Sequence, residues 1–141
     1  MSSSSFKTKV RVTWADTDAA GVVHFSKFFV FFERAEEEFY RSVGLSFKDF
    51  RNKGLWLPRV EAFCQYKKPA RFEDTLEVAL TIEELKEKSA KLGFMVNNEE
   101  TAELLANGYF VVVAADKNTG RATQIPKEFA DKLKRFAKQI L

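Results

Sequence analysis

The order of apolar and polar positions along the chain predicts a β-strand followed by a helix. Over residues 6–14 the two kinds of residue alternate, which places one face of a strand against the core and the other in solvent. Apolar residues then recur at spacings of three and four. This predicts a helix of four to five turns with Ser26 as its N-cap and Gly44 at its end. Its apolar stripe comprises Phe28, Phe29, Phe31, Phe32, Ala35 and Phe39.

The first half of this predicted helix is apolar on nearly every side. Glu36, Glu37 and Glu38 are expected to return its second half to solvent. So apolar a helix needs cover on several sides, and in a short chain only a sheet is large enough to supply it. Residues 46–53 are expected to add a short helical turn before the chain changes to strand chemistry.

Four further strands are predicted from segments rich in β-branched and aromatic residues. They cover residues 57–66, 75–85, 89–97 and 102–115, and each is separated from the next by charged, Pro, Asn or Gly turn residues. Because the links are short, we expect these four strands to form an antiparallel meander.

A C-terminal helix is predicted to follow, with Pro126 at its first position. Basic residues surround its apolar stripe, so it could contact an anionic membrane or an acidic partner, or it could cover a sheet edge or a subunit boundary. Packing is the favoured interpretation, and membrane contact is not expected. The stripe comprises Phe129, Leu133, Phe136 and Ile140.

Together these elements predict an α+β fold: a curved antiparallel sheet of about five strands wrapped around one long central helix, with a C-terminal helix. The 141 residues, 45% hydrophobic and 30% charged, fit one domain over residues 1–141, of which residues 1–5 are expected to be disordered. The net charge is +3 with no run of five like charges, so nucleic acid is not an expected partner. The absence of a leader and the lone Cys64 favour a cytoplasmic protein.

Candidate chemistry is concentrated in residues 16–25, which hold two carboxylates, a glycine turn and the only histidine, directly before the predicted helix. A hydrolytic site can be built from such groups. The spacing begins like an EF-hand, but Ala20 and Lys27 stand where two oxygen ligands belong, so calcium is rejected. One histidine and one distant cysteine support no other metal and no serine or cysteine triad.

Two segments of the chain carry a resemblance to a known family. Residues 16–35 read D-T-D-x-x-G-V-V, then aromatics and F-F-E-R-A, and residues 66–74 read Y-K-K-P-A-R-F-E-D. This pattern resembles the hotdog-fold acyl-CoA thioesterases of the 4-hydroxybenzoyl-CoA thioesterase type, over residues 6–129. The pair His24-Phe25 also resembles the branch that hydrolyses 1,4-dihydroxy-2-naphthoyl-CoA.

The resemblance implies an enzyme, a hydrolase that converts an acyl-CoA with a short-chain or aromatic acyl group to the free acid and coenzyme A. It implies that Asp18 is the nucleophile or the base for water, and that the backbone amide of Phe25 stabilises the oxyanion. No cofactor is implied beyond the coenzyme A of the substrate. The alternative is a non-catalytic hotdog protein that binds acyl-CoA or a lipid or supports an assembly.

Neighbouring residues have more open roles. Asp16 is expected to support the turn more than to catalyse, and Gly21 to supply an unusual backbone angle or close approach to the substrate. His24 could hydrogen-bond a substrate carbonyl or a catalytic water, or it could be a packed or exposed ring with no role. Phe28, at the start of the helix, is a candidate wall of the acyl pocket.

The phosphates of coenzyme A need cations, and Lys67, Lys68 and Arg71 form the best local cluster. The same cluster is also compatible with an ordinary solvated turn. A sheet of about five strands leaves two open edges and an incompletely covered aromatic helix. We therefore expect a homodimer or homotetramer, and the resemblance implies that the active site lies at the subunit interface.

Overall fold

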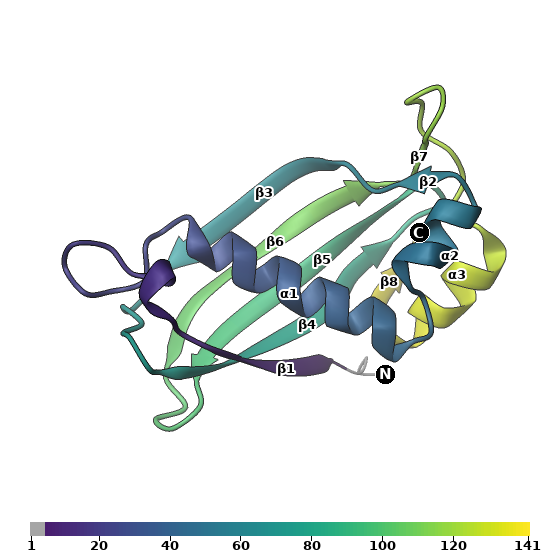
Figure 1. Cartoon of the computed structure of the whole chain (residues 1–141). Helices are drawn as coiled ribbons and strands as arrows, with labels where there is room; N and C mark the ends of the chain where they lie inside the picture. Colours follow the sequence, from purple (N-terminus) through teal and green to yellow (C-terminus); the bar gives the residue numbers. More distant parts are fainter. Residues whose placement is uncertain (1–4) are drawn as a thin grey trace.

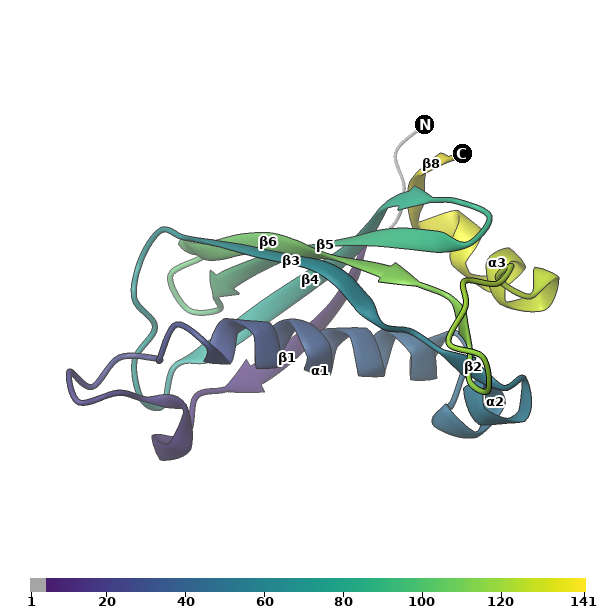
Figure 2. The same cartoon turned by 90° about the horizontal axis from the view of Figure 1, so that it is seen from above.

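The computed structural model describes residues 5–141, and its main feature is a curved sheet with helix α1 (Lys27–Ser42) along one face (Figures 1 and 2). The predicted disorder of residues 1–4 lies outside the described residues, and Ser5 is exposed. The strand order is β1-β4-β5-β6-β3, all antiparallel, and β8 pairs with β4 in parallel. The strands are β1 (Phe6–Arg11), β3 (Arg59–Tyr66), β4 (Thr75–Leu85), β5 (Ser89–Asn98), β6 (Leu104–Val113) and β8 (Ala137–Ile140).

The predicted four-stranded meander is wrong for one strand. β4, β5 and β6 follow one another in the sheet, but β3 pairs with β6 at the far edge. The reason is that β1 occupies the edge of β4 that a hairpin with β3 would need, with Phe6 opposite Leu80 and Arg11 opposite Thr75. The link from β3 to β4 therefore crosses one end of the sheet as a loop instead of closing a tight turn.

Helix α1 buries its aromatic stripe against the sheet, and Phe31, Phe32 and Phe39 are fully buried. The expectation that Glu36 faces solvent is wrong, because only 2% of its surface is exposed. Glu36 lies four residues after Phe32 and so shares the buried side of the helix. An ion pair with Arg59 of β3 compensates its burial.

The C-terminal prediction is only partly correct. Helix α3 (Lys127–Leu133) has Pro126 as its N-cap rather than its first residue, and it ends in a 3-10 turn, η2 (Lys134–Phe136). The chain then joins the sheet as β8, so Ile140 lies on an exposed strand and not on a helical stripe. β1 pairs with residues 75–80 only, and this leaves residues 82–85 of β4 free to pair with β8.

Two small elements close the end of the molecule where α1 finishes. Helix α2 (Phe47–Asn52) is capped by Ser46, whose hydroxyl accepts a hydrogen bond from the Asp49 amide. Strand β2 (Leu55–Trp56) pairs with β7 (Ala115–Asp116). The opposite end holds a 3-10 turn, η1 (Trp14–Asp16), and the loop that leads into α1 (Figure 1). Residues 16–25, which hold the candidate catalytic groups, therefore lie at the end of the molecule where α1 begins.

Candidate active site

Two loops that are far apart in the sequence lie side by side at the start of α1. The Val23 amide donates a hydrogen bond to the Ala70 carbonyl (2.8 Å), and Val22 forms a β-bridge with Arg71. The Tyr66 hydroxyl, at the end of β3, donates a hydrogen bond to the Phe25 carbonyl (2.8 Å). The fold thus joins the segment of residues 16–25 to the segment of residues 66–74.

Asp16 supports the turn that precedes this loop. Its carboxylate is buried and accepts hydrogen bonds from the Thr13 amide (2.9 Å) and the Thr13 hydroxyl (3.0 Å). Its backbone carbonyl accepts a hydrogen bond from the His24 amide (2.8 Å). Asp16 therefore connects η1 to the residue next to Phe25, which is the contact pattern of a structural residue.

Asp18 lies in an exposed turn that Gly21 closes. The Asp18 amide donates to the Val22 carbonyl (2.8 Å), and the Gly21 amide donates to the Asp18 carbonyl (3.0 Å). The side-chain Oδ1 accepts a hydrogen bond from the Ala20 amide (2.8 Å), whereas Oδ2 has no partner among the described residues. Gly21 has φ = +81°, which is the unusual backbone angle expected of it. One carboxylate oxygen is thus fixed while the other faces solvent.

The residue before the helix start presents a free backbone donor. The Phe25 amide has no hydrogen-bond acceptor among the described residues, and 63% of Phe25 is exposed. Ser26 has the helical φ and ψ of −68° and −22° but forms no side-chain cap, so it is an N-cap by position only. Unpaired N–H groups and the helix dipole make such a position suitable for a developing negative charge.

His24 is partly buried and stacks on the ring of Phe25, with centroids 4.4 Å apart. Its Nδ1 accepts a hydrogen bond from the Ser26 amide (3.2 Å) and lies 2.8 Å from the Ser26 hydroxyl. Because Nδ1 is an acceptor, the proton of the neutral ring is on Nε2. The ring therefore helps to fix the helix start and keeps one N–H available.

Of the remaining predicted site residues, the apolar one is buried and the three cations are exposed. Phe28 is buried in the core, where its ring packs edge-on against Phe31 and Tyr66. The Lys68 ammonium pairs with Glu103. Lys67 and Arg71 are exposed, and their side chains form no ion pair with a described residue. In the folded chain, two of the three cations remain available to an anion.

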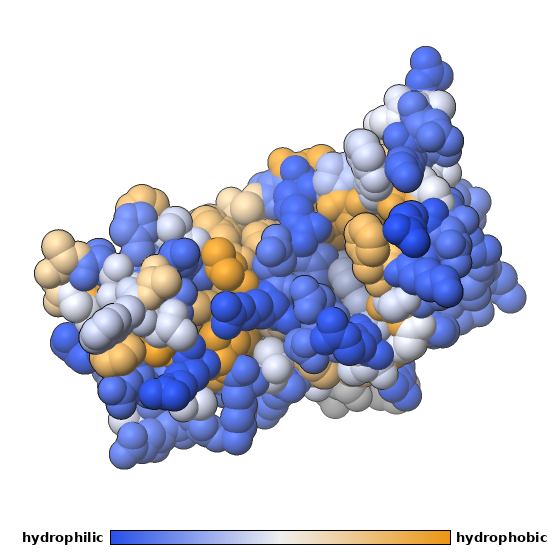
Figure 3. Space-filling view, in the orientation of Figure 1, coloured by the Kyte–Doolittle hydropathy of each residue, from blue (hydrophilic) through white to orange (hydrophobic). Residues whose placement is uncertain are grey.

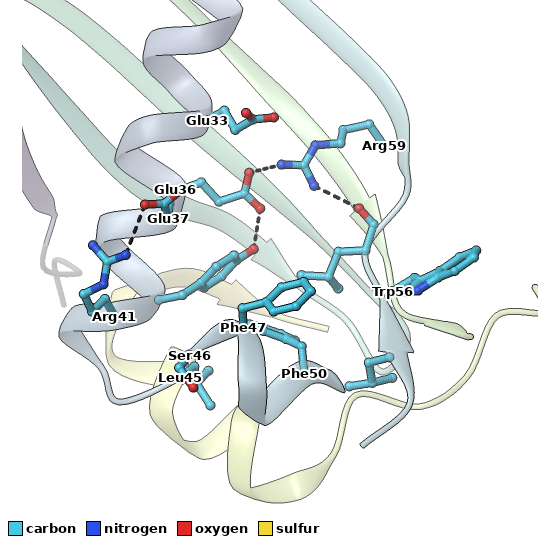
Figure 4. Close-up of a pocket in the computed structure, with 13 residues that line it drawn as sticks. Glu33, Glu36, Glu37, Arg41, Leu45, Ser46, Phe47, Phe50, Trp56 and Arg59 are labelled. Atoms are coloured by element: carbon cyan, nitrogen blue, oxygen red, sulfur yellow. Dashed lines mark hydrogen bonds and ion pairs between the residues drawn. The ribbon is translucent and has the colours of Figure 1, made fainter. Parts of the chain in front are cut away.

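A second group of polar residues, absent from the sequence predictions, lies at the other end of α1 (Figure 4). Glu36 accepts a hydrogen bond from the Tyr40 hydroxyl (2.5 Å) and forms an ion pair with Arg59. Burial raises the pKa of Glu36, and the charge of Arg59 and the Tyr40 hydrogen bond oppose the rise. The sequence carried one signal for this group, since Glu36 follows Phe32 by four residues on the apolar stripe.

The structure adds little support for other chemistry. Cys64 is partly buried on β3, and this burial raises the pKa of its thiol, which makes it a poor nucleophile. No group of three or more His, Cys, Asp or Glu side chains is arranged to hold a metal ion within residues 5–141. In the same part of the chain, no helix is long and apolar enough to cross a membrane.

Comparison with known proteins defines the class. The family model of the thioesterase-like superfamily matches residues 12–133. A putative esterase from Aquifex aeolicus is 40% identical over 124 residues, 88% of this chain and 94% of the relative. The acyl-CoA thioester hydrolase YbgC from Escherichia coli is 30% identical over 139 residues, 95% of this chain and 99% of the relative. The crystal structure of Slr0204, a 1,4-dihydroxy-2-naphthoyl-CoA thioesterase from Synechocystis, superposes with a TM-score of 0.86 at 28% identity, covering 92% of this chain and 96% of that one.

The α+β architecture is that of the hotdog fold, and the protein is an enzyme of the thioester hydrolase class. More narrowly, the chain belongs to the thioesterase-like superfamily.

Proposed function

We propose that this protein hydrolyses an acyl-CoA thioester to a free carboxylic acid and coenzyme A, with Asp18 and the Phe25 amide as its catalytic groups. The observation that carries the proposal is that an exposed carboxylate and an unpaired backbone N–H occur on one braced loop at a helix start. Membership in the thioesterase-like superfamily supports the same reaction.

The chemistry depends on these two groups. Asp18 either removes a proton from the attacking water or attacks the thioester carbonyl itself. In both routes the carbonyl oxygen gains negative charge, and the Phe25 N–H donates a hydrogen bond to it. The carbon–sulfur bond then breaks, and the coenzyme A thiolate leaves and takes up a proton. In the second route, water hydrolyses the resulting acyl-Asp18 anhydride.

The substrate is expected to combine a short-chain or aromatic acyl group with coenzyme A. The names of two relatives, an acyl-CoA thioester hydrolase and a 1,4-dihydroxy-2-naphthoyl-CoA thioesterase, support this range. Gly21 allows the substrate to approach the turn closely, and the Nε2–H of His24 is a second donor for the thioester or a water. Lys67 and Arg71, with Lys68 beside them, supply charge for the phosphates.

A homodimer would complete the site. β3 is the outer strand of the sheet, and its residues are exposed along nearly its whole length, so its edge is open to a second copy. Two copies of one strand that pair about a two-fold axis must run antiparallel. The end of the partner's β3, where Tyr66 holds Phe25, would then lie beside the start of this chain's β3 at Arg59. Each Asp18 loop would face the opposite end of the partner.

The test is a thiol-release assay of the full chain against short-chain, long-chain and aromatic acyl-CoA thioesters. We expect turnover of at least one class, and about 10²- to 10⁴-fold less with Asp18→Asn. Hydrolysis in ¹⁸O-labelled water under single-turnover conditions tests for the second route, because an unlabelled protein oxygen reaches the acid only when water attacks the Asp18 carbonyl carbon of the anhydride. Binding of acyl-CoA without release of thiol from any substrate would favour the non-catalytic alternative and contradict the proposal.

A further inference from the structure

A cavity of about 740 Å³ opens where α1 ends, between the second half of α1, helix α2 and the segment from β2 to β3 (Figure 4). This volume is in the range of small-molecule sites. Figure 3 shows apolar surface at this end of the molecule, bordered by hydrophilic side chains. The Asp18 loop of the same chain lies at the other end of α1 (Figure 1).

A buried polar network forms one wall of the cavity. Glu36, 2% exposed, is held by the Tyr40 hydroxyl and by the Arg59 guanidinium, and Arg59 also donates a hydrogen bond to the Leu57 carbonyl (2.9 Å). The guanidinium lies over the ring of Phe110, 5.1 Å from its centroid. These contacts fix the plane of the guanidinium. They use two of its five N–H donors and leave the others available to a ligand.

The rest of the lining is largely aromatic. Tyr40, Phe47, Phe50 and Trp56 all contribute. Phe47 is 77% exposed and Trp56 is 55% exposed, which are high values for large apolar side chains at the mouth of a cavity. Flat apolar walls with a few fixed donors are typical of sites that bind a small, partly polar group.

Charge restricts the kind of polar group that fits. Three carboxylates line the cavity, Glu33, Glu36 and Glu37, against the two guanidinium groups of Arg41 and Arg59. Arg41 is moreover paired with Glu37 and Glu38 on the exposed side of the helix. These carboxylates would repel an acyl group that carries a free carboxylate. A hydroxyl or keto oxygen on the acyl group accepts a hydrogen bond without adding charge.

Building on the proposed function, we propose that this cavity receives the acyl group of the substrate and that Arg59 donates hydrogen bonds to a neutral oxygen on it. Acyl groups that carry such an oxygen are then preferred over plain hydrocarbon ones. Glu36 and Tyr40 are positioning residues, since they act by holding Arg59. In the proposed dimer, the Asp18 loop of the partner subunit lies beside Arg59. The acyl group of one substrate molecule would therefore occupy the cavity of this chain while its thioester lies at the Asp18 loop of the partner.

The first test compares kcat/KM for benzoyl-CoA and its ring-hydroxylated derivatives, and for an alkanoyl-CoA and its hydroxyl-terminated counterpart. We expect the hydroxylated member of at least one pair to be preferred, and Arg59→Met to reduce that preference about tenfold or more. Tyr40→Phe, which removes one of the two contacts that hold Glu36 beside Arg59, should reduce it less. Arg41→Met is the matched control, because Arg41 lines the same cavity but is paired on its exposed side, and it should keep the wild-type preference.

The second test does not depend on turnover. In a Trp14→Phe background, Trp56 is the only tryptophan, and its emission reports on the cavity. Non-hydrolysable thioether analogues of the same acyl-CoA pairs should change this emission, with a lower Kd for the hydroxylated analogue. Arg59→Met should remove the difference in Kd between the two analogues.

The outcomes separate the two proposals. Turnover with a preference that neither Arg59→Met nor Tyr40→Phe alters would overturn the role of the cavity and leave the hydrolase intact. No turnover with any thioester would contradict the hydrolase, and the Trp56 titrations would still decide whether the cavity binds the acyl group. Should Arg59→Met fail to fold in a thermal melt, Tyr40→Phe decides, and an unchanged preference there would reject the inference.

Discussion

The chain contains two turns of nearly the same construction, one at Asp18 and one at Asp116. In each, an aspartate Oδ1 accepts hydrogen bonds from amides two or more residues later, and a glycine with positive φ closes the turn, at +81° in Gly21 and +72° in Gly120. The amide of each aspartate also bonds across the turn, to Val22 or to Arg121 (both 2.8 Å).

The two turns differ in the path that the chain takes after the glycine. After Gly21 the chain folds back, so that the His24 amide bonds to the Asp16 carbonyl and Tyr66 holds Phe25 at the helix start. The turn at Asp116 projects from the molecule beyond β7 (Figure 1). An aspartate in a glycine turn is thus a structural device in itself, and of these two turns only the one at Asp18 lies on a loop that also carries the unpaired Phe25 N–H.

The largest expected effect is a loss of hydrolysis when the carboxylate of Asp18, but not that of Asp116, is replaced by an amide. Asp18→Asn is expected to lower kcat/KM for acyl-CoA hydrolysis by about 10²- to 10⁴-fold, because the amide can neither take a proton nor attack the thioester. Asp116→Asn keeps a similar turn and should hydrolyse at the wild-type rate. Thiol release measures both variants, and equal activity in the two would show that Asp18 has no catalytic role.

The next effect should come from releasing the brace on the helix start. Tyr66→Phe removes the hydrogen bond to the Phe25 carbonyl and should lower kcat by about tenfold, since small displacements of a catalytic group are costly. Tyr109→Phe is the control, because Tyr109 stacks on Phe63 on β3, away from this loop. A wild-type kcat for Tyr66→Phe would mean that the Phe25 amide needs no support from β3.

Replacing each closing glycine by alanine should have similar effects on stability but different effects on activity. A Cβ at Gly21 or at Gly120 would meet nothing within 4 Å, so the cost arises from the left-handed backbone alone, about 1–2 kcal/mol each. Urea denaturation should give similar losses for both variants. Only Gly21→Ala should also reduce turnover, and a matching reduction by Gly120→Ala would remove the distinction between the turns.

The smallest expected effect is the pH dependence of the stability that Asp116 contributes. Hydrogen bonds from the Thr119 and Asn118 amides hold the pKa of Asp116 below its usual value of 3.8. An aspartate with a lowered folded-state pKa contributes stability above its unfolded pKa, and this contribution disappears as the pH falls through the folded value. The stability advantage of the wild type over Asp116→Asn should therefore be constant above about pH 5 and shrink below about pH 4. An advantage that grows on acidification would contradict this assignment.

Local patterns predicted the elements well, and they failed where the outcome depended on distant partners. The alternation and spacing of apolar residues located α1, and the strand over residues 75–85 agrees with β4. The position of β3 could not be read from link lengths, because it depends on β1 having taken the edge of β4. Burial of Glu36 depends on Arg59, 23 residues later.

The candidate site shows the same division. The turn at Asp18 and the helix start after it are local features, so the motif indicated both. The contact between Tyr66 and Phe25 spans 41 residues and exists only because β3 ends beside the helix. The cavity at Arg59 is lined by residues from three segments, α1, α2 and the segment from β2 to β3, and no short sequence pattern predicts that these segments meet.

The pairing of β1 with β4 also has a consequence for how the protein is made. Residues 6–11 find their partners only in residues 75–80, and the loop that carries Asp18 is tied to Ala70 and Arg71. Because synthesis runs from the N-terminus to the C-terminus, residues 6–11 leave the ribosome well before residues 75–80 and cannot pair until those residues have also emerged. A chain that ends before residue 75 should therefore leave residues 6–11 open to proteases, even though it already contains Asp18 and Phe25, the residues that we propose to be catalytic.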